Sequence, residues 1–151
     1  VQVIYNIFDQ NPEDELFPAC REMKVAVIAR VPFDEGTLTG TLTNESKWPE
    51  GDWRNNYFSP ENLIPSVERA ESIKQVLGAW NQERSTHILM PELALRFILS
   101  NQDVTTIIPG MRKRHHVESN IAASDEGPLP SELIKQLRQF RWVRKPAPWS
   151  D

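Results

Sequence analysis

The chain has a single cysteine and no long apolar stretch, and each scarcity excludes a class of protein. One cysteine cannot form an internal disulfide, and Cys20 has no Cys or His neighbours at metal-ligand spacing. We therefore expect a reducing, cytoplasmic setting and no metal site. No run approaches the roughly 18 apolar residues of a membrane-spanning helix, and the start of the chain lacks the charged and apolar regions of a signal peptide. Association with a membrane is not expected.

The acidic balance of the chain argues against a broad nucleic-acid-binding surface. Its formal net charge is -4, from 21 acidic and 17 basic residues. The basic cluster Arg112–Arg114 is then a local feature, and no aromatic platform for stacked bases accompanies it. With 151 residues, 39% of them hydrophobic, the chain has the size and apolar content of one globular domain.

The first thirty residues have the pattern of strand, helix and strand. Val1–Tyr5 is an apolar, β-branched run, and Asn11 stands as an N-cap before Pro12 at the start of a helix. The helix gives way near Lys24 to the continuous apolar run Val25–Ala29, which is typical of a strand covered on both faces in a parallel sheet. This pattern predicts a βαβ unit and an α/β fold.

Loops and amphipathic helices alternate along the rest of the chain. A turn punctuated by glycine follows Arg30, and the long aromatic loop Trp48–Phe58 is typical of a functional segment. The further predicted elements are helices at Ser59–Trp80 and Pro91–Leu99, a strand at Val104–Ile108, helices at Arg112–Ser124 and Ser131–Phe140, and an irregular tail at Pro146 and Pro148.

The segment Val104–Asn120 carries the clearest chemical signal. A β-branched run, then Pro109-Gly110, then helical spacing from Val117 predict a strand, a tight turn and a helix start. Basic residues in a first helical turn oppose the helix dipole, so the cluster Arg112–Arg114 there indicates an absent anion. Free backbone N–H groups, a glycine and basic side chains together describe a phosphate site, and a solvated basic turn is the alternative.

Taken in order, these pieces resemble the C-terminal half of an aldo-keto reductase, a (β/α)8 barrel that moves a hydride between NADP(H) and a carbonyl or alcohol. The segments that carry the resemblance are Val1–Asn6, Val27–Gly40, Leu93–Ser100 and Ile107–Asn120. The resemblance implies an α/β fold, the C-terminal part of a (β/α)8 TIM barrel with parallel strands, its sixth to eighth, and an extra C-terminal helix. Residues 1–151 would then be one portion of an NADP-dependent oxidoreductase domain whose N-terminal half is absent.

The same resemblance implies that this chain holds the cofactor. Gln2 matches a glutamine that helps hold the nicotinamide carboxamide, and Arg30 stands where many members place a tyrosine that stacks on the nicotinamide. A planar guanidinium can stack as well. The loop matched to the pyrophosphate contains Pro32, Phe33, Gly36 and Leu38, and that loop acts mostly through backbone N–H groups.

In the last motif the resemblance assigns the adenosine end of the cofactor. After the turn at Gly110, the side chains of Arg112, Lys113 and His116 match ligands of the 2′-phosphate. Asn120 matches a contact to the adenine edge, whereas Ser119 departs from the family's usual glutamate. Each assigned residue also has an ordinary structural interpretation, such as a barrel-interior glutamine, a salt-bridged arginine or a plain turn.

No match to the family's catalytic Asp, Tyr, Lys and His motifs precedes Val1, so no catalytic residue is assigned to this chain. Tyr5, Tyr57 and His87 are interpreted as structural. Two functions stay open: part of a reductase whose isolated fragment is inactive, or a non-catalytic NADP(H)-sensing regulatory module. The implied substrate is a small carbonyl or alcohol, contacted by the Trp48–Phe58 loop. Unpaired strand edges predict self-association or pairing with the missing half.

Overall fold

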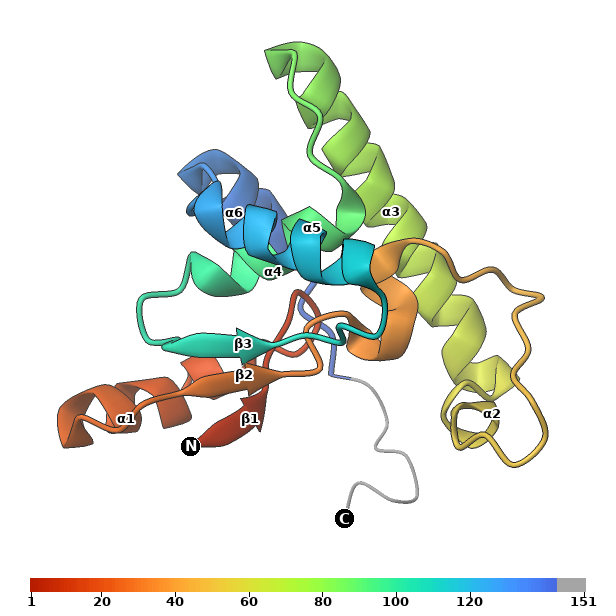
Figure 1. The fold of residues 1–151 in the computed structure, drawn as a ribbon, viewed down its shortest axis with the longest axis horizontal. Coiled ribbons are helices and arrows are strands. Elements are labelled where there is room, and N and C mark those ends of the chain that lie inside the picture. Colours follow the sequence, from red (N-terminus) through yellow and green to blue (C-terminus); the bar gives the residue numbers. More distant parts are fainter. Residues whose placement is uncertain (144–151) are drawn as a thin grey trace.

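Three short parallel strands form the sheet at the base of the molecule (Figure 1). The computed structural model describes residues 1–143, so the expectation for Pro146 and Pro148 lies outside the described residues. The strands are β1 (Gln2–Ile4), β2 (Ile28–Arg30) and β3 (Thr106–Ile108), in the order β1-β2-β3. This arrangement confirms the predicted α/β class with parallel strands.

Six α-helices and two 3₁₀ segments complete the described part of the chain, residues 1–143. They are η1 (Asn11–Glu13), α1 (Leu16–Met23), η2 (Asp34–Thr39), α2 (Arg54–Tyr57), α3 (Pro60–Arg84), α4 (Met90–Leu99), α5 (Arg114–Asp125) and α6 (Ser131–Arg138). In Figure 1 α4, α5 and α6 lie together on one side of β3. Within residues 1–143, no helix combines the length and the apolar character needed to cross a membrane.

The sheet has one face against the core and one open face. The register aligns Val3, Ala29 and Ile107 across the three strands, and these residues face the core, with Ala29 fully buried. Side chains alternate between faces along a strand, so the flanking residues point the other way. Arg30 and Ile108 are accordingly exposed. The expectation that the second strand is covered on both faces is therefore wrong for the described residues.

Several predicted boundaries differ from the observed ones. Asn11 does not cap an α-helix at Pro12, because Asn11–Glu13 form the 3₁₀ segment η1 and α1 begins at Leu16. The Asn11 side-chain oxygen accepts hydrogen bonds from Arg141 instead, at 2.6 Å and 3.1 Å. The second strand begins at Ile28 because Lys24 adopts a left-handed conformation and the chain then leaves α1 in an irregular segment. Helix α6 ends at Arg138, before the predicted end at Phe140.

The last two predicted elements before α6 also begin two residues late. The strand expected from Val104 begins at Thr106, because the Val104 amide bonds back to the Asn101 carbonyl at 3.1 Å. Helix α5 begins at Arg114, since Lys113 has an extended backbone with φ -119° and ψ 149°. Two cations expected in the first helical turn, Arg112 and Lys113, therefore lie just outside it.

Arg96 links α4 to the C-terminal end of α5. Its guanidinium is buried and donates from Nε to the Gly127 carbonyl at 2.9 Å, and from Nη2 to the carbonyls of Glu126 and Pro128 at 3.4 Å and 3.3 Å. Nη1 forms an ion pair with Glu92 at 2.7 Å. Glu126 is the C-cap residue of α5, and Gly127 and Pro128 follow it, so Arg96 holds the segment that leaves the helix. A cation near the C-terminal end of a helix also interacts favourably with the negative end of its dipole.

Replacing Arg96 by alanine should lower the free energy of unfolding by about 2 to 3 kcal/mol, because three carbonyls lose a charged donor and Glu92 loses its partner. Arg96→Lys should recover part of the loss, since an ammonium supplies the charge without the planar fork. Arg114→Ala is the control, because it removes an exposed ion pair of the same spacing, with Glu118. Urea denaturation that gave equal losses for both alanine variants would contradict this account of Arg96.

Candidate functional site

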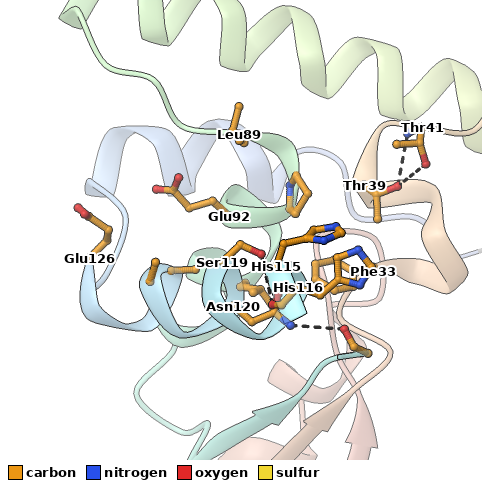
Figure 2. Close-up of a pocket in the computed structure, with 15 residues that line it drawn as sticks. Phe33, Thr39, Thr41, Leu89, Glu92, His115, His116, Ser119, Asn120 and Glu126 are labelled. Carbon is orange, nitrogen blue, oxygen red and sulfur yellow. Dashed lines mark hydrogen bonds between the residues drawn. The ribbon is translucent and has the colours of Figure 1, made fainter. Parts of the chain in front are cut away.

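A cleft of about 720 Å³ runs along α5, between α4 and the segment that follows β2 (Figure 2). A smaller cavity of about 250 Å³ shares Phe33, Thr39 and Gly110 with it and reaches the carboxyl ends of β2 and β3. Phe33, His115, His116 and Asn120 gather near one end of the cleft in Figure 2, and Glu126 lies at the other. The two cavities together form a groove from the strand ends along a helix.

The loop that follows β2 is held in a strained backbone conformation. Val31, Asp34 and Glu35 have φ values of 56°, 49° and 54°, in the left-handed region that side chains disfavour. The neighbouring Gly36, at φ 112°, adopts a conformation that essentially requires glycine. Such strain persists only when the surroundings fix it. Here the side-chain amide of Asn6 donates to the Val31 carbonyl at 3.0 Å. The loop is therefore pre-shaped at the mouth of the smaller cavity.

The interior of this loop is wound around one carbonyl. The amides of Gly36 and Leu38 both donate to the Phe33 carbonyl, at 3.0 Å and 2.9 Å. The Leu38 side chain is fully buried in the core and anchors the loop. A contact from Leu38 to a ligand would therefore have to come from its backbone.

The turn that follows β3 leads directly into α5. The Asn120 side chain donates to the Gly110 carbonyl at 3.4 Å and so ties the second turn of the helix to the loop before it. The Ser119 hydroxyl bonds to the His116 carbonyl at 3.2 Å within the helix. Both Ser119 and Asn120 line the cleft.

Two adjacent histidines occupy the first turn of α5 at the cleft. The rings of His115 and His116 meet edge to face, with centroids 4.3 Å apart. Desolvation, followed by the positive charges of His115, Lys113 and Arg112, lowers the pKa of His116 below its ordinary value. Two cations, Arg112 and Lys113, therefore lie close enough to this end of the cleft to act on His116.

Some of the predicted site residues line a cavity and others do not. Those that line the larger cleft or the smaller cavity are Pro32, Phe33, Gly36, Gly110, His116 and Asn120. Gln2 and Arg30 are exposed instead on the open face of the sheet, on β1 and β2. Arg112 and Lys113 are exposed just before α5 and line neither cavity. The structure thus brings the loop and turn residues together and leaves the sheet residues apart from them.

Several cleft residues were not expected from the sequence. Thr39 and Thr41 form its upper rim, with their hydroxyl oxygens 2.8 Å apart, and His115 stands beside His116. Glu92 reaches the cleft from α4. Thr39 lies in the glycine-punctuated loop, and this was a weak indication of a functional role. Glu92 has the pattern of an ordinary solvent-facing helix residue.

The residues interpreted as structural lie away from both cavities. Tyr5 packs between Phe17 and Phe97, with ring centroids at 4.9 Å and 6.1 Å, and its hydroxyl contacts Glu13 and Asn101. Burial, with the bond to Glu13, raises the pKa of Tyr5 above its usual range. Tyr57 and His87 do not line either cavity. In the part of the chain that the structure describes, no three His, Cys, Asp or Glu residues are grouped to hold a metal ion.

The loop before α3 packs on itself. Trp48 stacks on Phe58 with ring centroids 4.8 Å apart, and the Arg54 guanidinium lies 5.7 Å from the Trp48 ring centroid. The hydrogen bonds and charge of Arg54 lower the pKa of Asp52 to about 2. Trp53 is left 48% exposed. The loop is therefore a small ordered unit that offers one large aromatic surface to solvent.

Residues 1–141 match the sequence model of the Aldo/keto reductase family. The chain is 30% identical over 125 residues to the NADH-specific methylglyoxal reductase of Escherichia coli, covering 82% of this chain and 36% of that protein. It is 28% identical over 144 residues to the aldo-keto reductase yakc, named with NADP(+), of Schizosaccharomyces pombe, covering 92% and 40%. The chain thus spans about two fifths of the length of these relatives.

Solved structures share the arrangement of the chain. A glycerol dehydrogenase of Gluconobacter oxydans superposes with a TM-score of 0.75 at 21% identity, over 92% of this chain and 41% of that one. The apo form of an aldo-keto reductase of Bacillus halodurans gives 0.65 at 23% identity, over 99% and 46%. At these identities the similarity concerns the fold alone.

Gly36→Ala should lower the melting temperature, because a side chain at φ 112° is strained by about 1 to 3 kcal/mol even though open space surrounds the position. Gly110→Ala is the matched control, since its added methyl group also meets open space and its backbone is not left-handed. Thermal unfolding should separate the two variants. The same melting temperature for both would show that the loop relaxes without cost.

Proposed function

Because the chain belongs to the aldo/keto reductase family, we propose that it supplies the NADP(H)-binding part of an enzyme that transfers a hydride between a nicotinamide and a carbonyl or alcohol. The observation that carries the proposal is the groove that joins the strained loop after β2 to the turn at Gly110 and the first turn of α5. Barrels of this class often bind phosphate at these two loops. The oxidoreductases among the relatives support the same reaction class.

We also assign the three strands to the sixth, seventh and eighth positions of a (β/α)8 barrel, with residues 1–151 as the C-terminal portion of one domain. The parallel order β1-β2-β3 and the open face of the sheet support this assignment. Within residues 1–143, β1 and β3 each pair on one side only. Further strands of the same barrel, or a second copy of this chain, would cover those edges.

The residues present suit an anionic dinucleotide. Within residues 1–143 neither Arg112 nor Lys113 forms a salt bridge, whereas the next cation, Arg114, is paired with Glu118 at 2.7 Å. Unpaired cations beside the free first turn of a helix match the charge of a 2′-phosphate. The pyrophosphate would lie against the backbone of the loop that contains Gly36, and Asn120 would meet the adenine.

The nicotinamide end is assigned to the open face of the sheet. Gln2 and Arg30 are exposed there, so the amide and the guanidinium are free to hold and stack on the ring. When bound, NADPH supplies the hydride. The chain's own contribution is to bind and orient the dinucleotide, and substrate would approach from the side of the Trp48–Phe58 loop.

A non-catalytic NADP(H)-sensing module is the second candidate. Neither cavity is lined by a tyrosine or a lysine, two residue types that act as general acids and that belong to the family's catalytic set. Carbonyl reduction assayed with the intact parent protein decides between the two. A parent that binds NADPH tightly and reduces no aldehyde, ketone or sugar supports the sensing module.

Arg112→Ala should weaken NADPH binding about tenfold or more and leave NADH binding nearly unchanged, because a charge-assisted contact contributes roughly 1.5 to 3 kcal/mol. Fluorescence titration with each cofactor measures both affinities. Arg114→Ala removes the same charge from a paired, exposed neighbour and should change neither. Equal losses for the two cofactors in Arg112→Ala would rule out a 2′-phosphate contact.

Arg30→Ala should slow hydride transfer more than it weakens cofactor binding. Adenosine and pyrophosphate contacts carry most of the affinity, whereas a stacked guanidinium orients the reacting ring. Single-turnover measurement of NADPH oxidation by the intact parent protein gives the rate of the transfer itself. An unchanged rate would leave Arg30 with a structural role.

A further inference from the structure

Of the three side chains proposed for the 2′-phosphate, His116 alone can change its charge near neutral pH. Arginine and lysine stay protonated throughout the physiological range, whereas the ordinary pKa of histidine lies within it. His116 is half-buried in the first turn of α5 and lines the cleft. Its backbone amide donates to the Lys113 carbonyl at 2.9 Å, which places residue 116 in the helical turn that follows the basic segment.

The charges nearest to His116 on its own segment are positive. The His115 ring lies 4.3 Å away, centroid to centroid, and Lys113 and Arg112 precede it. From the loop after β2, the cleft presents the uncharged Phe33, Thr39 and Thr41.

The carboxylates of the cleft are placed differently. Glu92 of α4 also lines it and is paired with Arg96 at 2.7 Å, and Glu126 lies toward the far end of the helix in Figure 2. Glu118, on α5 itself, is paired with Arg114 at 2.7 Å. The environment therefore disfavours a proton on His116 while the site is free.

We propose that His116 sets the discrimination between NADPH and NADH by taking up a proton when the 2′-phosphate binds, so that the preference for NADPH grows as the pH falls. This proposal rests on the proposed function and adds a specificity determinant to it. The proton comes from the solvent and forms an N–H bond on the imidazole, so the ligand's negative charge is met by a third cation beside Arg112 and Lys113.

The direction in which NADPH affinity changes with pH follows from the linkage between proton binding and ligand binding. In the free protein the pKa of His116 lies below its ordinary value, so the ring is neutral at neutral pH. A phosphate dianion beside the ring raises that pKa, because it stabilises the charged imidazolium. Affinity for NADPH then increases as the pH falls through the raised pKa and levels off below the pKa of the free protein. NADH lacks the phosphate and gains nothing from the proton.

The 2′-phosphate is itself titratable near pH 6, as phosphate monoesters are, and this weakens binding at low pH. In a variant that cannot titrate at position 116, only the titration of the phosphate remains. His116→Gln keeps a polar side chain of similar length, and the difference between it and the wild type belongs to the histidine. His116→Arg places a permanent charge at the same position and should prefer NADPH at every pH.

The experiment compares dissociation constants for NADPH and NADH in the intact parent protein between about pH 8 and about pH 5.5. In the wild type the ratio of NADH to NADPH dissociation constants should rise about tenfold more than in His116→Gln, the size of one charge-assisted contact. His87→Gln is the matched control, because His87 is exposed and lines neither cavity. It should behave as the wild type does.

Calorimetry supplies a readout that a structural role would not change. Titration of NADPH near pH 6.5 in two buffers of different ionisation enthalpy should show more protons taken up per NADPH bound by the wild type and by His87→Gln than by His116→Gln or His116→Arg, in which only the phosphate titrates. Adenosine 2′-monophosphate should reproduce the uptake and adenosine 5′-monophosphate should not, which separates the 2′-phosphate from phosphate in general.

Two failures are distinguishable. If NADPH binds more tightly than NADH but the ratio has the same pH dependence in the wild type, His116→Gln and His116→Arg, this inference is wrong and the proposed function stands. If neither dinucleotide binds to the folded wild-type protein at any pH, the proposed function fails and the inference fails with it. Should His116→Gln not fold, the His116→Arg comparison with the wild type still decides.

Discussion

Alternation along three parallel strands is the constraint on which the rest of this structure depends. It turns Val3, Ala29 and Ile107 toward the helices and leaves Arg30 and Ile108 on the opposite face. Because the strands are parallel, the loops that leave β2 and β3 emerge at the same edge of the sheet. The glycine-punctuated loop and the basic turn become neighbours for this reason, although more than seventy residues separate them in the sequence.

Local patterns were sufficient to predict most elements and insufficient to predict where they begin. The β-branched runs and the apolar spacing of α3 are properties of adjacent residues, so the strands and the long helix were predictable. The start of the first helix was not, because Asn11–Glu13 form a 3₁₀ turn and the Asn11 side chain bonds to Arg141, a contact between residues 130 positions apart. Left-handed Val31 was equally unpredictable, since a β-branched residue there is disfavoured and only its surroundings impose it.

In the candidate site, too, some residues were predictable from local patterns and others were placed by tertiary packing. Phe33, Gly110, His116 and Asn120 belong to contiguous motifs that the resemblance in sequence singles out, and all four line the same cleft. Glu92 enters the same cleft from a helix that precedes β3, and no local feature distinguishes it from other solvent-facing glutamates. Its position results from the packing of α4 against α5, which is a tertiary property.

The buried contacts of Arg96 fix the end of α5 that lies farthest from the histidines. A helix of 12 residues is about 18 Å long, so a tilt of about 5° at the fixed end moves the opposite end by roughly 1.5 Å. The Asn120 bond to Gly110, at 3.4 Å, is long and resists such a tilt weakly. Small repacking around α4 is therefore amplified at the first turn of α5. The position of the two histidines thus depends on side chains at the opposite end of their helix.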